Sequence, residues 1–149
     1  MTVKISDIET AGQRLQGIIN PTPTISDGRM EEVIGAPALL KAESLQRGGS
    51  FKVRGAYNKI SQLTDEEKSR GVIAASAGNH AQGVALAARL TGIKSTIVLP
   101  EFAPLTKVIA TKSYGAKVIL KGGSFDEAVA YSKELQAENG YTYVHAFED

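Results

Sequence analysis

Apolar positions in the second half of the chain fall in short continuous runs, and longer amphipathic stretches separate these runs. Four runs have the length of buried strands: residues 72–75, 95–99, 117–120 and 141–145. The stretches between them predict three helices, over residues 79–90, from 104 to about 115, and 124–139. This alternation predicts an α/β fold, with a parallel sheet, right-handed crossovers and helices on both faces.

Start and stop signals support these elements. Thr64 to Glu67 and Ser124 to Glu127 have the hydroxyl and glutamate spacing of capping boxes, so each predicts the start of a helix. Pro104 is suited to the first residue of a helix, and Asn139-Gly140 to the end of one. The helical segments are therefore bounded by residues that favour those ends.

The pattern before residue 50 is less regular. Four apolar residues recur at helical spacing: Ile8, Ala11, Leu15 and Ile18. Ser6 is the expected N-cap of this helix, residues 20–35 predict a loop with one short helix, and residues 38–43 predict a strand. One helix and one strand bury little together, so we expect this part to belong to a larger sheet that the chain does not complete.

Composition excludes several classes of function. Lys and Arg number 17 against 16 Asp and Glu, which leaves no electrostatic footprint for nucleic acid or anionic lipid. The chain has no cysteine, and His145 has no second ligand at metal-binding spacing, so thiol chemistry and a metal site are not expected. The N-terminus lacks an apolar signal core and no run has the length of a membrane span, which predicts a cytoplasmic location.

The stretch Ser50-Phe51-Lys52-Val53-Arg54-Gly55-Ala56 carries the first candidate chemistry. Lys52 follows an aromatic residue at the expected start of a helix from Ser50 to about Leu63, behind a Gly-Gly turn. A lysine at the base of a cleft loses its charge by desolvation and attacks carbonyl groups. Taken alone, a solvated surface lysine is the commoner case. Arg54 would either lower the basicity of Lys52 through like-charge repulsion or be a solvated or salt-bridged arginine, and we favour the second interpretation.

A second motif, Ser76-Ala77-Gly78-Asn79-His80-Ala81-Gln82-Gly83, follows a predicted strand and opens a helix. Backbone N–H groups and the helix dipole converge at such a turn, and Gly78 lets the backbone approach a ligand, so the loop is suited to a carboxylate. Ser76 and Asn79 add polar groups. The alternative is an ordinary turn capped by Ser or Asn. His80 as a general base is a third interpretation, which we discount in favour of a hydrogen bond within the turn.

The two motifs, in this order and at this spacing, resemble those of the threonine and serine dehydratases, pyridoxal-phosphate enzymes of the tryptophan-synthase-β-like fold. Three further segments extend the resemblance along nearly the whole chain: Thr22-Pro23-Thr24, Leu40-Lys41-Ala42-Glu43-Ser44-Leu45-Gln46 and Pro100-Glu101-Phe102-Ala103-Pro104-Leu105-Thr106-Lys107. Gly48 departs from the family, which often has Thr at this position.

The resemblance implies a cofactor, pyridoxal 5′-phosphate, and a set of roles. Lys52 would form a Schiff base with the cofactor and later take the α-proton of the substrate, while Phe51 would lie against the cofactor ring. The Asn79 amide would meet the cofactor 3′-oxygen. The substrate carboxylate would be held by the loop Ser76, Ala77, Gly78, Asn79 and His80.

The implied reaction is dehydration and deamination of L-threonine to 2-oxobutanoate and ammonia, with L-serine to pyruvate as a related activity. Serine racemases share these motifs, and both isoleucine biosynthesis and threonine catabolism use this chemistry, so these alternatives stay open. The implied partners are an amino-acid substrate and, in the intact enzyme, further copies of the same chain.

Members of the family are considerably longer than 149 residues. We therefore expect an N-terminal portion, with residues 1–50 as an incomplete segment of the large cofactor domain and residues 51–149 as a small α/β domain. The resemblance places the glycine-rich phosphate loop, and the Ser or Cys that faces the pyridine nitrogen, further downstream. The alternative from a different class is a catalytically silent α/β module that binds small carboxylates or pairs with other subunits.

Overall fold

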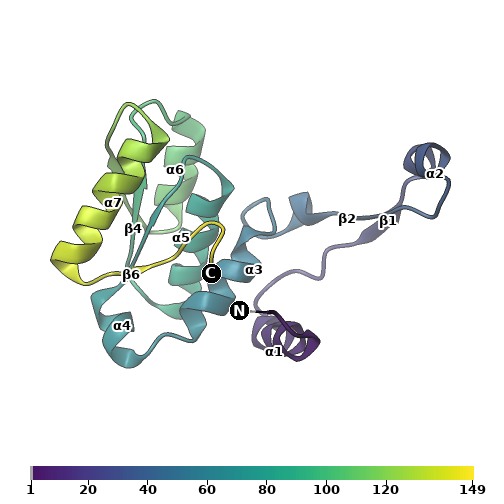
Figure 1. Ribbon diagram of the computed structural model, residues 1–149, viewed down its shortest axis with the longest axis horizontal. Coiled ribbons are helices and arrows are strands. Elements are labelled where there is room, and N and C mark those ends of the chain that lie inside the picture. Colours follow the sequence, from purple (N-terminus) through teal and green to yellow (C-terminus); the bar gives the residue numbers. More distant parts are fainter. Residues whose placement is uncertain (1) are drawn as a thin grey trace.

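Four parallel strands form the central sheet in the computed structural model, which describes residues 2–149 (Figure 1). Their order across the sheet is β5-β4-β3-β6. The bounds are β3 (Val72–Ala75), β4 (Ser95–Leu99), β5 (Lys117–Leu120) and β6 (Thr142–Tyr143). The predicted parallel sheet is confirmed, although β6 is shorter than the expected run over residues 141–145.

Helices cover both faces of this sheet, as the apolar runs predict. One face carries α3 (Lys52–Ser61), α5 (Asn79–Thr91) and α6 (Leu105–Ser113), and the other carries α7 (Phe125–Asn139). Successive residues of β3 alternate between the two cores, because strand side chains point to opposite faces. None of the helices within residues 2–149 combines the length and the apolar content needed to span a bilayer.

Helix starts follow the predicted signals with two differences. Thr64 and Glu67 form the full capping box that opens α4 (Asp65–Arg70). Ser124 Oγ accepts a hydrogen bond from Glu127 N, but the Glu127 carboxylate accepts from Gly123 N, so only half of the second box forms. Pro104 lies one residue before α6, as its N-cap.

The N-terminal region forms one helix and an arm. In α1 (Ile5–Leu15) the prediction that Ser6 is the N-cap is wrong, because the helix begins after Lys4, whose N–H donates to Asp7 Oδ2 at 2.9 Å. The predicted loop over residues 20–35 contains α2 (Gly28–Ile34) and also β1 (Thr24–Ser26), which pairs antiparallel with β2 (Leu39–Lys41). Figure 1 shows β1, β2 and α2 extending away from the sheet as a thin arm.

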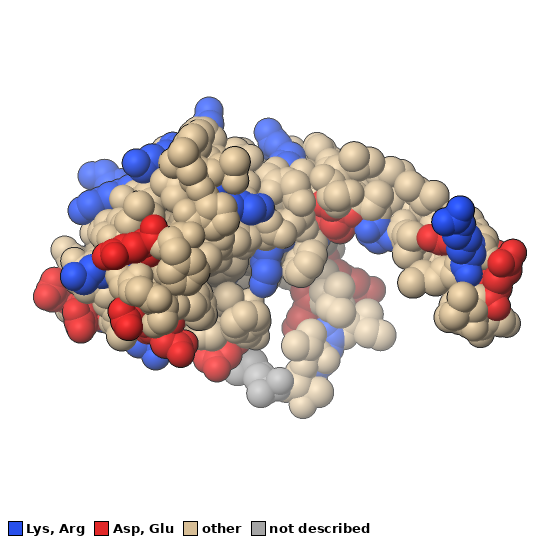
Figure 2. All heavy atoms as spheres, turned by 90° about the horizontal axis from the view of Figure 1, so that it is seen from above, with Lys and Arg blue, Asp and Glu red and all other residues tan. Residues whose placement is uncertain are grey.

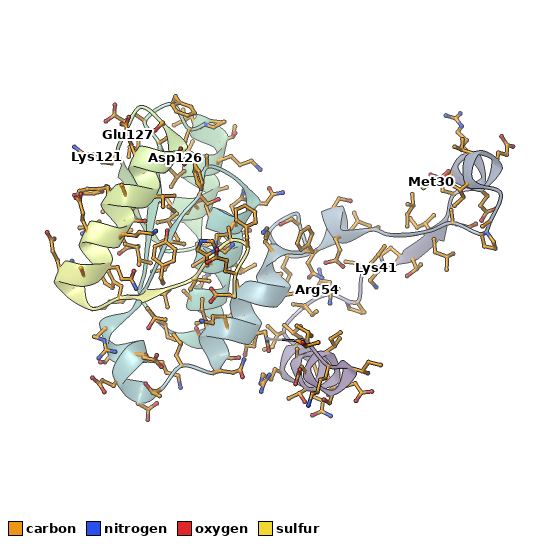
Figure 3. All side chains as sticks on the ribbon, in the orientation of Figure 1. Met30, Lys41, Arg54, Lys121, Asp126 and Glu127 are labelled. Carbon is orange, nitrogen blue, oxygen red and sulfur yellow. The ribbon has the colours of Figure 1, made fainter. Side chains whose placement is uncertain are left out.

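The arm leaves apolar side chains exposed. Met30 lies at its far end (Figure 3), where charged residues of both signs also gather (Figure 2). Six of its apolar side chains are exposed: Ile25, Met30, Val33, Ile34, Leu39 and Leu40. The assignment of residues 1–50 to a larger domain stays a prediction, which this exposure supports.

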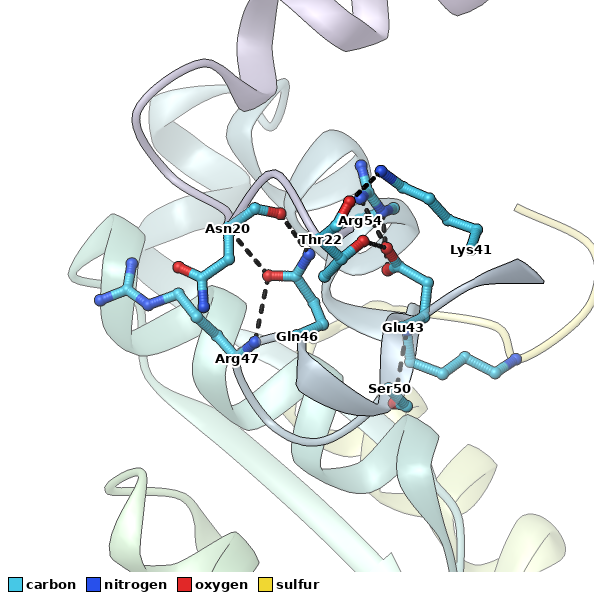
Figure 4. A network of polar contacts seen from close by, with 9 residues as sticks. Asn20, Thr22, Lys41, Glu43, Gln46, Arg47, Ser50 and Arg54 are labelled. Atoms are coloured by element: carbon cyan, nitrogen blue, oxygen red, sulfur yellow. Dashed lines mark hydrogen bonds and ion pairs between the residues drawn. The ribbon is translucent and has the colours of Figure 1, made fainter. Parts of the chain in front are cut away.

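A polar network ties the root of the arm to α3 (Figure 4). The Glu43 carboxylate, in the 3₁₀ helix η1 (Glu43–Leu45), accepts two hydrogen bonds from the Arg54 guanidinium, at 2.8 and 2.7 Å. Thr22 Oγ1 donates to the same carboxylate, and Lys41 Nζ donates to the Thr22 carbonyl. The interpretation of Arg54 as a salt-bridged residue is confirmed.

A second group of contacts in the network centres on the buried Gln46. Its amide closes a pair of hydrogen bonds with the backbone of Asn20, at 2.9 and 2.8 Å, and also accepts from Arg47 N. The bonds from Arg54, aided by the Thr22 hydroxyl, lower the pKa of Glu43 from 4.5 to about 2. Residues 20–22 and 41–47 are therefore held to the helix that carries Lys52.

Replacing Glu43 by Gln should lower the free energy of unfolding at neutral pH by roughly 2 kcal/mol, because a neutral amide leaves Arg54 without its charged partner. The carboxylate contributes stability above its unfolded pKa of 4.5, and this contribution is lost as the pH falls toward 2. Urea unfolding across this pH range measures the effect.

The difference in stability between wild type and Glu43→Gln should shrink as the pH falls. Glu9→Gln, on the exposed face of α1, is the matched control and should show no difference at any pH. A constant difference for Glu43→Gln down to the lowest pH would contradict the role given to this ion pair.

Candidate active site

The candidate site lies at the carboxyl ends of the parallel strands, where ligands bind in open α/β sheets. A cavity of about 180 Å³ opens there between α3, the start of α5 and the segment that follows β6. Its lining includes three of the predicted site residues: Phe51, Lys52 and His80. The structure therefore brings together Lys52 and His80, which come from the two motifs and lie 28 positions apart in the sequence.

Lys52 is the first residue of α3, and its amine is held inside the cavity. Lys52 Nζ donates to the Ala146 carbonyl at 2.9 Å and lies 5.6 Å from the ring centroid of Phe51 and 5.4 Å from that of Phe147. The prediction that Ser50 begins the helix is wrong by two residues, and its hydroxyl is only at the limit of a bond, 3.5 Å from Lys52 N.

The backbone of Lys52 lies directly against Gly83 in the middle of α5. A Cβ atom on Gly83 would lie 2.9 Å from both the carbonyl carbon and the Cβ of Lys52, closer than real Cβ atoms approach other atoms. A glycine inside a helix costs about 1 kcal/mol relative to alanine. The close packing of α3 on α5 explains why a glycine occupies this position.

The loop between β3 and α5 has the form that the second motif predicts. Ser76 Oγ accepts from Gly78 N at 3.1 Å, and α5 begins at Asn79 with Gly78 as its N-cap. The Ser76 hydroxyl thus bonds within the turn, as the alternative of a turn capped by Ser predicts, while within residues 2–149 no side chain caps α5 itself at Gly78. The first-turn N–H groups of a helix have no partner within the helix, and the helix dipole favours a negative charge beside them.

Four predicted residues of this loop do not line the cavity itself. Ser76 is buried, Ala77 and Gly78 are half-buried and Asn79 is exposed. They directly precede His80, which does line the cavity, at the start of α5. The roles given to these residues stay predictions.

His80 joins the start of α5 to the end of the sheet. Its Nε2 lies 3.0 Å from the Val144 carbonyl, and because a carbonyl only accepts, the neutral ring carries its proton on Nε2. Burial lowers the pKa of His80 below its ordinary value, so the ring is neutral at neutral pH. The prediction that His80 forms a hydrogen bond within the turn is wrong, because its partner is the carbonyl of Val144, directly after β6.

Residues 145–149 form the remaining wall, which the motifs did not predict. The ring nitrogen Nδ1 of His145 accepts from the backbone of Phe147 and Glu148, at 3.2 and 3.1 Å. Asp149 bonds to Lys59 Nζ at 2.6 Å and to the N–H of His145. The sequence could have indicated these residues through their position directly after the last strand, because ligands bind at the carboxyl ends of the strands in such sheets.

Comparisons with known proteins agree with this geometry. The sequence profile of the family described as pyridoxal-phosphate dependent enzyme matches residues 15–149. A curated L-threonine ammonia-lyase of Thermotoga maritima is 49% identical over 147 residues, which cover 99% of this chain and 37% of the relative. The L-threonine dehydratase catabolic TdcB of Staphylococcus aureus is 54% identical over 148 residues, covering 99% and 43%.

Solved structures give the same result. A maize serine racemase matches with a TM-score of 0.92 at 38% identity, over 100% of this chain and 45% of that one. The processed form of threonine deaminase isoform 2 from Solanum lycopersicum matches with a TM-score of 0.85 at 35% identity, over 100% and 42%. These neighbours confirm the predicted fold. The chain spans about two fifths of the length of the curated relatives.

Replacing Gly83 by Ala should destabilise the protein by about 1–3 kcal/mol, because the added methyl group overlaps the backbone of Lys52. Gly12→Ala is the control, since a Cβ there meets no atom within 4 Å, and it should stabilise α1 by up to about 1 kcal/mol. Urea unfolding measures both. Equal stabilisation by the two substitutions would show that α3 does not pack on Gly83 as closely as described.

Proposed function

The chain belongs to the family of pyridoxal-phosphate dependent enzymes, and on this premise we propose that it serves the dehydration and deamination of L-threonine to 2-oxobutanoate and ammonia. One observation carries the proposal: the Lys52 amine is held in a cavity beside the N-terminus of α5. Among the described residues, no side chain caps this N-terminus, so its N–H groups are available to a ligand. The curated relatives named as threonine ammonia-lyase and threonine dehydratase support the choice of substrate.

The residues present fit the ring of pyridoxal phosphate. Among the described residues that line the cavity, Lys52 carries the only lysine amine, and the rings of Phe51 and Phe147 offer flat apolar surfaces on which a planar aromatic ring can rest. Lys52 would hold the cofactor through its aldehyde carbon, with Phe51 against the ring and the Asn79 amide toward the 3′-oxygen. When bound, the cofactor supplies an electron sink for the pair of electrons left by loss of the α-proton.

The start of α5 would bind the substrate carboxylate. Its first-turn N–H groups and the hydroxyl of Ser76 are donors, the helix dipole favours a negative charge there, and Gly78 has no side chain to block the approach. The loop Ser76, Ala77, Gly78, Asn79 and His80 would orient the α-carbon relative to α3 in this way.

Once the substrate amino group has replaced Lys52 on the cofactor aldehyde carbon and freed its amine, Lys52 Nζ would take the α-proton of the substrate. In the structure its hydrogen-bond partner is the Ala146 carbonyl, a group that orients the amine without competing for its lone pair. His80 Nε2 donates to the Val144 carbonyl, and through this bond His80 would hold the start of α5 to the segment after β6. The wall formed by residues 145–149 would keep water from the amine.

One related activity remains an alternative, and the metabolic role of the proposed activity has two candidates. The similarity to maize serine racemase favours a racemase-type reaction on serine, which product analysis for D-serine would reveal. The relatives named catabolic support a catabolic role, whereas a role in isoleucine biosynthesis stays a prediction.

We further propose two domains, with residues 51–149 as the small α/β domain and residues 1–50 as part of a larger one. The exposed apolar side chains of the arm support the second assignment. An amino-acid substrate, assembly into a homo-oligomer and a cytoplasmic location complete the proposal.

Replacing Lys52 by Ala in the intact enzyme should abolish the visible absorption band of bound cofactor and lower threonine turnover by about 10²–10⁴-fold or more, since the covalent anchor and the base are the same amine. Lys68→Ala, on exposed α4, is the control and should keep both. Absorption spectra and a 2-oxobutanoate assay measure the two effects. If Lys52→Ala kept both the absorption band and the turnover, Lys52 could be neither the cofactor anchor nor the base.

The 149-residue polypeptide alone should show little or no dehydratase activity, because relatives with this activity are more than twice as long. Purified polypeptide is mixed with pyridoxal phosphate and L-threonine, and 2-oxobutanoate is assayed. Near-zero turnover, together with a circular-dichroism spectrum of a folded α/β protein, would favour the hypothesis that these residues alone form a catalytically silent module. Robust turnover would show that these residues complete the site by themselves or between copies.

A further inference from the structure

Lys107 contacts the predicted cofactor-binding residue Asn79 from a neighbouring helix. It lies in the first turn of α6, is half-buried, and its Nζ donates to Asn79 Oδ1 at 3.0 Å. Lys107 ends the segment Pro100 to Lys107, which contributes to the family resemblance but received no role. The contact joins the loop after β3 to the helix after β4 at the carboxyl edge of the sheet.

The stability of α6 does not explain a lysine at this position. A cation in the first turn of a helix is opposed by the helix dipole, and here the amine also lies at the start of α5, a second positive helix end. The backbone around Lys107 is fixed, because its N–H donates to the Pro104 carbonyl at 2.8 Å and its carbonyl accepts from Thr111 Oγ1 at 2.8 Å. A local rule broken in this way is typical of a functional position.

The chemistry of the two groups determines how the Asn79 side chain is turned. An ammonium group can only donate hydrogen bonds, so the amide must present Oδ1 to Lys107. The Asn79 amide nitrogen then faces away from Lys107, with two hydrogens to donate. Without the ammonium group, oxygen and nitrogen could exchange places by rotation about the last side-chain bond.

We propose that Lys107 is a positioning residue, which holds the Asn79 amide so that its NH₂ group donates to the 3′-oxygen of pyridoxal phosphate. The proposal rests on the proposed function. A 3′-oxygen that is ionised can only accept hydrogen bonds, so an amide turned the other way would place two acceptors together. Lys107 thus favours cofactor binding through Asn79 without touching the cofactor.

Three substitutions in the intact protein test the proposal. Lys107→Met removes the donor and keeps the length of the side chain, Lys107→Arg keeps a donor, and Lys112→Met removes an exposed lysine from the last turn of the same helix. The first measurement is the NMR signal of the Asn79 side-chain amide without cofactor, assigned by its loss in Asn79→Ala. The second is the dissociation constant of pyridoxal phosphate, with the position of its visible band.

Lys107→Met should shift the Asn79 amide signal, move the visible band and weaken cofactor binding about tenfold. Lys107→Arg should restore binding to within about twofold, and Lys112→Met should change nothing. An unchanged amide signal or unchanged cofactor affinity in Lys107→Met would overturn the proposal. Failure of the wild type to take up pyridoxal phosphate would instead refute the proposed function, and the amide signal alone would then decide whether Lys107 holds Asn79.

Discussion

The packing of α3 against α5 at Gly83 is the contact on which the rest of the site depends. The backbone of Lys52 packs directly on α5 at this glycine, so the position of the lysine relative to the start of α5 is fixed. A side chain at Gly83 would separate the amine from the loop that is proposed to bind the carboxylate. Catalysis by two groups requires them to be held within a fraction of an ångström, and a helix interior holds positions better than a loop does.

Ion pairs and hydrogen bonds hold α3 from its other side. The bidentate pair of Arg54 and Glu43 directs the guanidinium away from the cavity, toward the root of the arm. The amine of Lys52 is left to the Ala146 carbonyl and two aromatic rings. Helix α3 is thus fixed by an apolar contact on one side and a charged network on the other, and of these two cations it is Lys52 that faces the cavity.

Most of the sheet could be predicted because its signals are local. Strands β3, β4 and β5 match the apolar runs to the residue. Strands β3 and β4 are buried on both faces and need no alternation, whereas β5, at the edge of the sheet, is partly exposed. Gly140, at a φ of 67°, ends α7 as glycine permits. The arm was harder. Strand β1 has only three residues, too few to show an alternation of apolar and polar positions, and both β1 and its partner β2 are exposed. The pairing of the two strands could therefore not be predicted from the sequence.

The candidate site likewise has residues that local sequence motifs predict and residues that they do not predict. Lys52, Phe51 and the loop after β3 could be identified from motifs, because each motif is contiguous. Gly83, Lys107 and Ala146 contact these candidate residues from other segments. Gly83 does so by lacking a side chain, Lys107 through its amine and Ala146 through its carbonyl. Only a fold reveals such contributions. The residues proposed to bind could therefore be predicted from the sequence, whereas the residues proposed to position them are seen only once α3, α5 and α6 are placed together.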